Sequence, residues 1–226
     1  MKGIIAIFLF QICVLTAISQ KTKTVTKEFS STNQISERYC VLKSDKGIKH
    51  GEYISYFQAT MDEYKQIKKG KIKLDDFTKQ KGHFTIGKKV GEWVEYIKPS
   101  ELKTKGNYDN DKKVGIWITS KEKGQVMEKY DYDNNQKLKP EISVVISYPS
   151  RARNKGIEGK VYVSFKTNKD CSLSDFSVIK SVSAECDKEA IDKLKKLGEL
   201  NKKYGVDEDC EEKIDTFRVN FKLSEE

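Results

Sequence analysis

The sequence predicts an α+β protein in which a stack of antiparallel β-hairpins is followed by a small β-β-α-β domain. Three observations carry this prediction: a 24-residue repeat in the first half, strand alternation with one amphipathic helix in the second half, and a composition able to bury a core. The 226 residues are 37% hydrophobic and 34% charged, with a net charge of +9. This composition excludes disordered and multi-span membrane proteins.

The first nineteen residues predict a cleaved signal peptide. Lys2 precedes an apolar run of 16 residues from Gly3 to Ile18, and the small residues Ala17 and Ser19 suit cleavage after Ser19. A bilayer span needs roughly 20 residues, so we favour export over a retained inner-membrane anchor, which stays open as the alternative. We expect residues 20–39 to form an N-terminal linker.

A 24-residue repeat organises residues 40–138. The recurring pairs are Gly82/Gly106, Phe84/Tyr108, Val90/Val114, Gly91/Gly115 and Trp93/Trp117. Each copy has a turn rich in Gly, Asn, Asp and Lys, then a glycine, then a strand. We expect the glycine to supply a positive φ or a close backbone approach, and the tryptophans to be core stacking residues. The insertion over residues 59–71 has a helical pattern.

These repeats resemble the MORN type, whose core is a glycine followed two places on by Trp or Tyr. The matching segments are Gly51-Glu52-Tyr53, Gly91-Glu92-Trp93 and Gly115-Ile116-Trp117. The resemblance implies a platform that binds lipid membranes or proteins. Residues 20–140 contain 26 Lys and Arg against 17 Asp and Glu, so an anionic lipid or peptidoglycan surface is a candidate partner. Evenly spread lysines also suit an ordinary solvated face that protects strand edges.

The second half, residues 141–226, predicts a small antiparallel sheet covered by one helix. Val161 and Val163 alternate with polar residues in a strand, which a turn joins to a second strand. Ala190 and Leu194 lie on the apolar face of the helix that follows, and residues 216–223 alternate again as a last strand.

The run from Tyr148 to Phe165 resembles the C-terminal domain of TonB, the energy transducer of the Gram-negative envelope. Tyr148-Pro149, Arg151-Ala152 and the stretch GIEGKVYVSF follow the family pattern in order and spacing, and the resemblance covers about residues 141–223. It implies a non-catalytic domain whose sheet edge accepts an extended segment of an outer-membrane receptor as an added strand. By this resemblance the partner-binding residues are Tyr148, Pro149, Arg151, Arg153, Thr216, Arg218, Asn220 and Lys222.

The resulting hypothesis is an exported, non-catalytic protein of the periplasm that binds extended segments of outer-membrane receptors or other envelope proteins. Two alternatives stay open: an anchored transducer of TonB type that drives receptor-mediated uptake, and a lipid- or glycan-binding MORN-type scaffold. The chain has only 3 prolines, which argues against the proline-rich spacer of a transducer. Nucleic acid is not an expected partner, and an open sheet edge makes a homodimer a further candidate.

Cysteines and histidines give no indication of a metal or cofactor. His50 and His83 lie in separate repeats, and the sequence has no C-x-x-C pair, Walker loop or G-x-S-x-G motif, so we expect no enzyme. Beyond the signal, four cysteines favour disulfides in an exported protein, although three pairings are open. We expect Cys186 to pair with Cys210, with unpaired thiols as the alternative.

Overall fold

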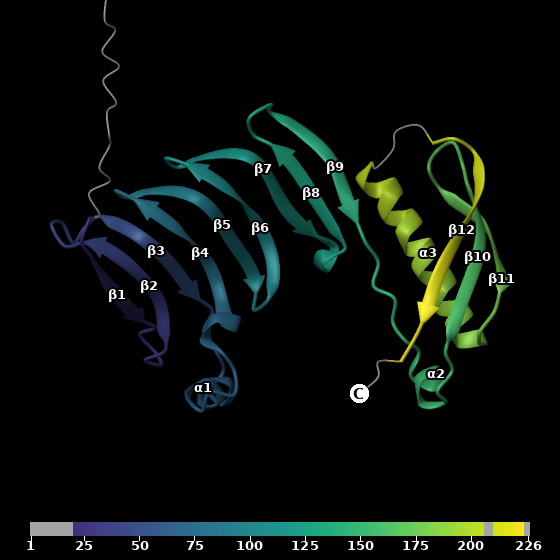
Figure 1. Ribbon diagram of the computed structural model, residues 1–226, viewed down its shortest axis with the longest axis horizontal. Coiled ribbons are helices and arrows are strands. Elements are labelled where there is room, and N and C mark those ends of the chain that lie inside the picture. Colours follow the sequence, from purple (N-terminus) through teal and green to yellow (C-terminus); the bar gives the residue numbers. More distant parts are fainter. Residues whose placement is uncertain (1–19, 206–209, 224–226) are drawn as a thin grey trace, which may run out of the picture.

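The computed structural model describes residues 20–205 and 210–223, and the expected signal peptide at 1–19 lies outside these residues. Two separate sheets carry the fold, one of nine strands in sequence order and one of three strands in the order β11-β10-β12 (Figure 1). The strands of the first sheet are β1 Thr22–Glu28, β2 Ile35–Leu42, β3 Lys49–Tyr56, β4 Thr78–Thr85, β5 Lys88–Lys98, β6 Glu101–Asp109, β7 Lys112–Lys121, β8 Val126–Asp131 and β9 Gln136–Ile142. The predicted α+β class, with an antiparallel stack before a small helix-covered sheet, is confirmed.

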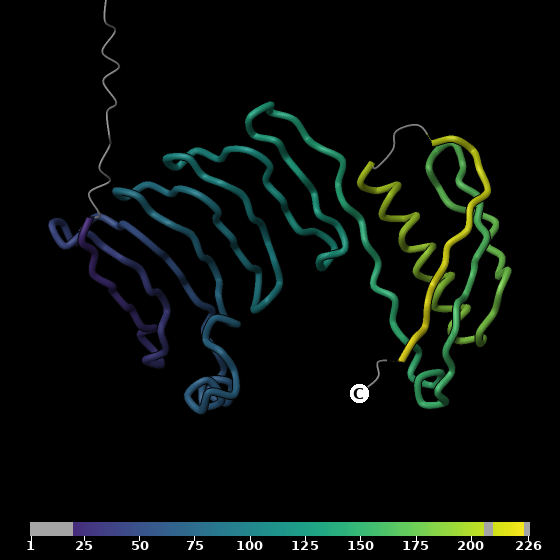
Figure 2. Tube along the Cα trace, viewed as in Figure 1, coloured from purple at the N-terminus to yellow at the C-terminus, as the bar shows by residue number. Residues whose placement is uncertain are grey.

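The nine-stranded sheet is one layer thick. Each strand pairs antiparallel with the next, and the trace in Figure 2 follows these strands without a second layer over them. The insertion predicted to be helical contains α1 (Met61–Lys68), which starts at a Thr60–Glu63 capping box but has no buried residue. In the described part of the chain, no helix lies over the faces of β1–β8 (Figure 1), so side chains on these faces must exclude water from one another.

A row of stacked aromatic rings on one face of the sheet does this. Trp93 and Trp117 are only 3% and 5% exposed, which confirms the prediction that they are core residues. The Tyr108 ring separates the two indoles. Its centroid lies 6.1 Å from that of Trp93 and 5.0 Å from that of Trp117. Lys89 and Lys113 each place an ammonium group 4.2 Å from an indole centroid, and their aliphatic stems cover the rings.

The repeated glycines have two separate roles. Gly91 and Gly115 have positive φ values of 64° and 61°, which confirms one expectation. Gly106 instead gives space, because a Cβ atom built there would lie 2.3 Å from the Trp117 ring. The indole N–H of Trp117 then donates to the Asn107 carbonyl at 3.1 Å, which holds the ring flat against the neighbouring strand.

Two expected boundaries are wrong. Residues 20–39 are not a linker, because they contain β1 and the start of β2, which pair from Thr22 with Leu42 onward. The period-two pattern in TKTVTKE is that of a strand, but its lysines and threonines lack the apolar repeat core that marks the later strands. At the other end, β9 runs through Pro140 to Ile142, so the first sheet extends into the segment assigned to the second domain.

The C-terminal domain packs one long helix on its sheet. Its elements are α2 Ser150–Asn154, β10 Gly159–Thr167, β11 Leu173–Lys180, α3 Ala184–Tyr204 and β12 Lys213–Phe221. Val161 and Val163 of the central strand are fully buried against Ala190 and Leu194 of α3, as the alternation and the helical spacing predict. The last strand begins at Lys213, three residues before the predicted start at Thr216, and it ends at Phe221.

A small polar contact joins the two parts. The Glu122 carboxylate, in the turn between β7 and β8, receives hydrogen bonds from Lys203 at 2.6 Å and from the Tyr204 hydroxyl at 3.0 Å. Both donors lie in the last turn of α3. The end of this helix is thus held against the first sheet, next to β9 (Figure 1).

We predict that Gly106→Ala lowers the free energy of unfolding by about 3 kcal/mol, because the methyl group would displace the Trp117 ring from a packed site. Urea unfolding followed by tryptophan fluorescence measures the change. Gly47→Ala is the control: its nearest neighbour would be an exposed Asp45 oxygen at 3.3 Å, and a shift within about 0.5 kcal/mol is expected. Equal effects of the two substitutions would contradict the packing role of Gly106.

Candidate functional site

β12 is an edge strand, since β10 is its only partner among residues 20–205 and 210–223. The direction of its backbone groups follows from the neighbouring hairpin. Asn168 donates its N–H to the Ser172 carbonyl at 2.9 Å, so the backbone groups of Asn168 face β11. Those of Thr167, one residue earlier, must then face β12 and its register partner Lys213.

The same alternation turns every second residue of β12 outward. Counting from Lys213, the backbone groups of Thr216, Arg218 and Asn220 point away from β10. An independent contact agrees, because the Thr216 N–H donates to the Asp215 carboxylate at 2.8 Å rather than to β10. This hydrogen bond also lowers the pKa of Asp215. The charged Asp215 carboxylate thus occupies the Thr216 N–H, one of the outward-facing donors of the edge.

One end of this edge is flanked by the chain itself. The Tyr148 ring lies 5.5 Å from the Phe221 ring, and the Tyr148 hydroxyl donates to the Ile157 carbonyl. The segment before α2 therefore lies beside the end of β12 (Figures 1 and 2). The edge is more accessible over Lys213–Arg218 than near Phe221.

A groove of about 480 Å³ opens beside this accessible half, between α3 and the sheet. Phe165, Leu197 and Phe217 form part of its apolar wall, and all three are only half-buried. Thr216 and Asp215 of the edge strand form part of its rim. Sequence patterning indicates that these apolar residues face the helix, but it gives no sign that α3 leaves them partly uncovered.

The eight residues expected to bind a partner do not form one cluster. Thr216, Arg218, Asn220 and Lys222 lie along or just beyond β12 and are exposed. Pro149 precedes α2 as its N-cap residue. Arg151 is 3.7 Å from the Glu185 carboxylate, and Arg153 lies over the Tyr148 ring at 5.6 Å. Contacts within the domain thus account for the α2 arginines, while the β12 residues line the free edge.

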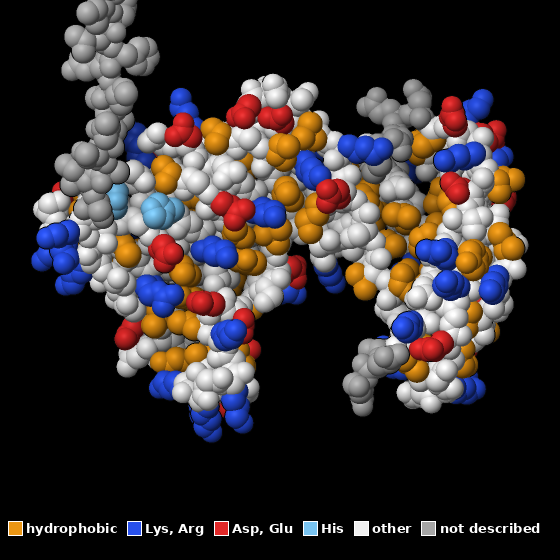
Figure 3. Space-filling view, viewed as in Figure 1, with side chains coloured by type: hydrophobic (Ala, Val, Ile, Leu, Met, Phe, Trp, Pro, Cys, Tyr) orange, Lys and Arg blue, Asp and Glu red, His pale blue; other side chains and the backbone are white. Residues whose placement is uncertain are grey.

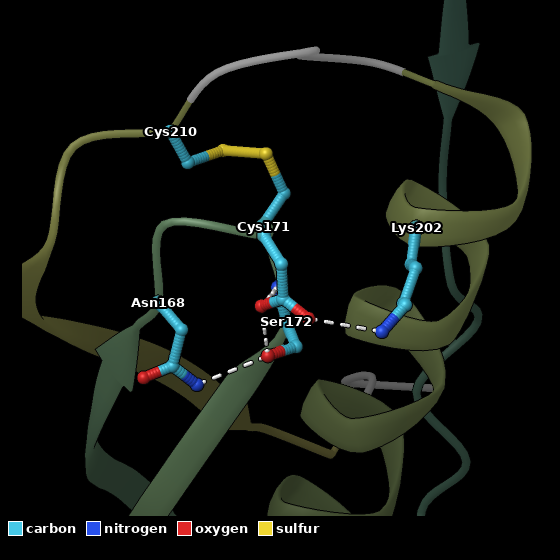
Figure 4. The surroundings of a disulfide bond; sticks show 6 residues. Asn168, Cys171, Ser172, Lys202 and Cys210 are labelled. Atoms are coloured by element: carbon cyan, nitrogen blue, oxygen red, sulfur yellow. Dashed lines mark hydrogen bonds and ion pairs between the residues drawn. A yellow bond between two sulfur atoms is a disulfide. The ribbon is translucent and has the colours of Figure 1, made fainter.

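A disulfide crosslinks the chain just before β12 to the β10–β11 turn. It joins Cys171 in the β10–β11 turn to Cys210, with Cα atoms 5.2 Å apart, and both residues also line the groove (Figure 4). Around it, Lys202 of α3 reaches the Asp170 carboxylate at 3.0 Å. The turn, the helix end and the start of the edge strand are therefore tied together at one place.

The expected Cys186–Cys210 pairing is wrong, because these residues lie at opposite ends of α3. Eighteen residues of helix separate Cys186 from Tyr204, a rise of about 27 Å. Cys186 is instead a fully buried free thiol in the first turn of the helix, and Cys40 is the other free cysteine among the described residues. The short sequence separation between Cys186 and Cys210 favours this pair, but it carries no information on the helix that holds the two residues apart.

Charge on the visible surface is mixed, with lysines and acids interspersed over both sheets (Figure 3). Three of these lysines lie over rings of the aromatic stack: Lys49 over Tyr53, Lys89 over Trp93 and Lys113 over Trp117. Burial against these rings lowers the pKa of Lys89, with smaller opposing effects from Asp111 and Glu95. Packing of the ring stack is thus sufficient to explain these lysines.

Within residues 20–205 and 210–223, no helix is both long and apolar enough to cross a membrane. No three His, Cys, Asp or Glu side chains of that part of the chain gather in a way that could hold a metal ion.

The chain thus combines a nine-stranded repeat sheet with a small helix-covered sheet that has β12 as an edge strand. The profile of a family described as Gram-negative bacterial TonB protein C-terminal matches residues 144–223, about a third of the chain. This similarity ties the C-terminal domain to the Gram-negative cell envelope, to outer-membrane transport and to a non-catalytic family. No family match covers the repeats, so their likeness to the MORN type stays a prediction. No curated protein and no solved structure matches the chain.

Acid should remove the contribution of Asp170 to stability. Hydrogen bonds from the Ser172 hydroxyl and then from Lys202 lower the pKa of Asp170 from 3.8 to about 2. A lowered pKa in the folded state stabilises the fold above the ordinary pKa, and this contribution is lost as pH falls through about 2. The gap in urea midpoint between the native protein and Asp170→Asn should therefore shrink between pH 4 and pH 2. A gap independent of pH would contradict this assignment.

Removal of the disulfide should destabilise the C-terminal domain by about 3–4 kcal/mol, the chain-entropy value for a closed loop of 39 residues. Urea unfolding of Cys210→Ser against the native protein measures it, with Cys40→Ser as the control. Alkylation under native conditions, followed by mass spectrometry, should label Cys40 and leave the buried Cys186 unlabelled. A peptide crosslinked through Cys186 would contradict the pairing.

Proposed function

We propose that this chain is an exported, non-catalytic protein of the periplasm, and that its C-terminal domain binds extended segments of envelope proteins by strand addition at β12. Outer-membrane receptors are the partner class that the family similarity favours. The observation that carries the proposal is the outward-facing backbone of Thr216 and Arg218 on an unpaired edge. Affinity would come from main-chain hydrogen bonds, so side chains of the edge need not be specialised.

The same geometry makes the strand edge a better candidate than the ring-covered sheet face. An extended partner can satisfy the free N–H and C=O groups of β12, whereas the lysines over the aromatic rings already have a packing role. For this reason the anionic lipid and peptidoglycan alternatives have no specific observation in their favour. A homodimer through β12 is the competing use of the same edge.

A proline substitution tests strand addition without disturbing the core. Arg218→Pro removes an N–H that faces outward, whereas proline at the buried Val219 would remove one that faces β10. We expect Arg218→Pro to weaken binding of synthetic receptor plug-region peptides at least tenfold, measured by isothermal titration calorimetry with the full chain.

Arg218→Thr is the matched control, because it removes the same charge and keeps the backbone donor. Its affinity should stay within about threefold of the native protein, the range of one exposed charge contact. Circular dichroism and urea midpoints check that both variants are folded. If the proline and threonine variants bind equally well, strand addition at this edge is excluded.

A further inference from the structure

We propose that the groove between α3 and β12 receives one bulky apolar side chain of the strand that adds to β12. This inference rests on the proposed strand addition and specifies the chemistry of the partner segment. The occupant is an extended peptide with an aromatic or large aliphatic residue, and with an acidic residue three positions away from it.

Among the described residues, the groove is the part of the helix-sheet interface that side chains leave unfilled. At one end of the sheet, Val161 and Val163 are 0% exposed and Phe221 is 2% exposed under α3. Towards the disulfide, Phe165 and Phe217 lie on the same face but are only half-buried. A partner side chain would cover the apolar area that stays in water at this end, and removal of that area from water would favour binding.

The edge and the groove are continuous. Asp215 and Thr216 belong to the accessible half of β12 and also line the groove. Directly opposite residues of paired strands project to the same face of a sheet. A partner residue opposite Asp215 would therefore project towards α3, where the groove opens. Its volume of about 480 Å³ leaves room for one large side chain.

Charge fixes the second feature of the partner. Arg218 is exposed on the opposite face of β12 and forms no ion pair with any residue in 20–205 or 210–223. A partner residue opposite Arg218 lies three positions from one opposite Asp215, and the odd spacing places the two on opposite faces. An acidic residue there would complement the guanidinium, while the residue opposite Asp215 must not be acidic because it would meet that carboxylate.

Nine-residue peptides rich in threonine and valine test this proposal with the full-length protein. One peptide contains Phe and Glu three residues apart, made in both orders because the added strand can run in either direction. Matched peptides replace Phe with Ala, or Glu with Gln. Fluorescence anisotropy should give at least tenfold weaker binding for the alanine peptide and about threefold weaker binding for the glutamine peptide.

Variants of the protein locate the contact. Leu197→Trp fills the groove and should reduce the affinity of the Phe peptide to that of the Ala peptide, with the Ala peptide unaffected. Glu199→Trp is the control, since Glu199 is an exposed residue of α3 that does not line this groove, and it should bind like the native protein. Urea midpoints establish that both variants are folded.

Three outcomes would overturn the inference. Equal affinity for the Phe and Ala peptides, with both sensitive to Arg218→Pro, removes the groove and leaves strand addition intact. Absence of binding by every peptide, including the receptor-derived ones, removes strand addition and the groove together. A dimer in sedimentation velocity that Leu197→Trp dissociates would assign the groove to a second copy of this chain instead.

Discussion

The contact between each tryptophan and the glycine on the neighbouring strand determines the first two-thirds of this protein. A sheet of one layer has no opposite layer to bury its rings, so each indole must lie flat on the next strand, and only glycine leaves room for it. The contact recurs every 24 residues because a hairpin of that length returns the ring to the same place. Lysine stems over the rings complete the burial, so part of the net charge of +9 has a packing origin.

The C-terminal domain is stabilised in a different way. Its helix and sheet share one core, so a change at Val163 or Leu194 is felt throughout, whereas each hairpin of the repeat sheet depends mainly on its neighbours. The free edge of β12 is partly protected, because the Asp215 carboxylate occupies one outward-facing amide and the segment before α2 flanks the end near Phe221. The half of the strand beside the disulfide is therefore the more accessible one.

Patterns that repeat along the chain predicted most of the fold. The 24-residue period and the helical spacing around Leu194 fix the hairpins and α3, because burial at those positions recurs at regular intervals. β1 was missed since its threonines and lysines need no core to form a strand once β2 offers a template. The disulfide and the groove depend on helix direction and on where α3 leaves the sheet, which are three-dimensional quantities that no local pattern records.

The position of the disulfide also decides how the domain would respond to tension. Cys210 lies three residues before Lys213, so the crosslink transfers a pull on the start of β12 directly to the β10–β11 turn. The Thr167–Lys213 pair lies at the same end of the ladder as the disulfide, so a load applied there would pass through the crosslink into β10 rather than through the hydrogen bonds between β10 and β12.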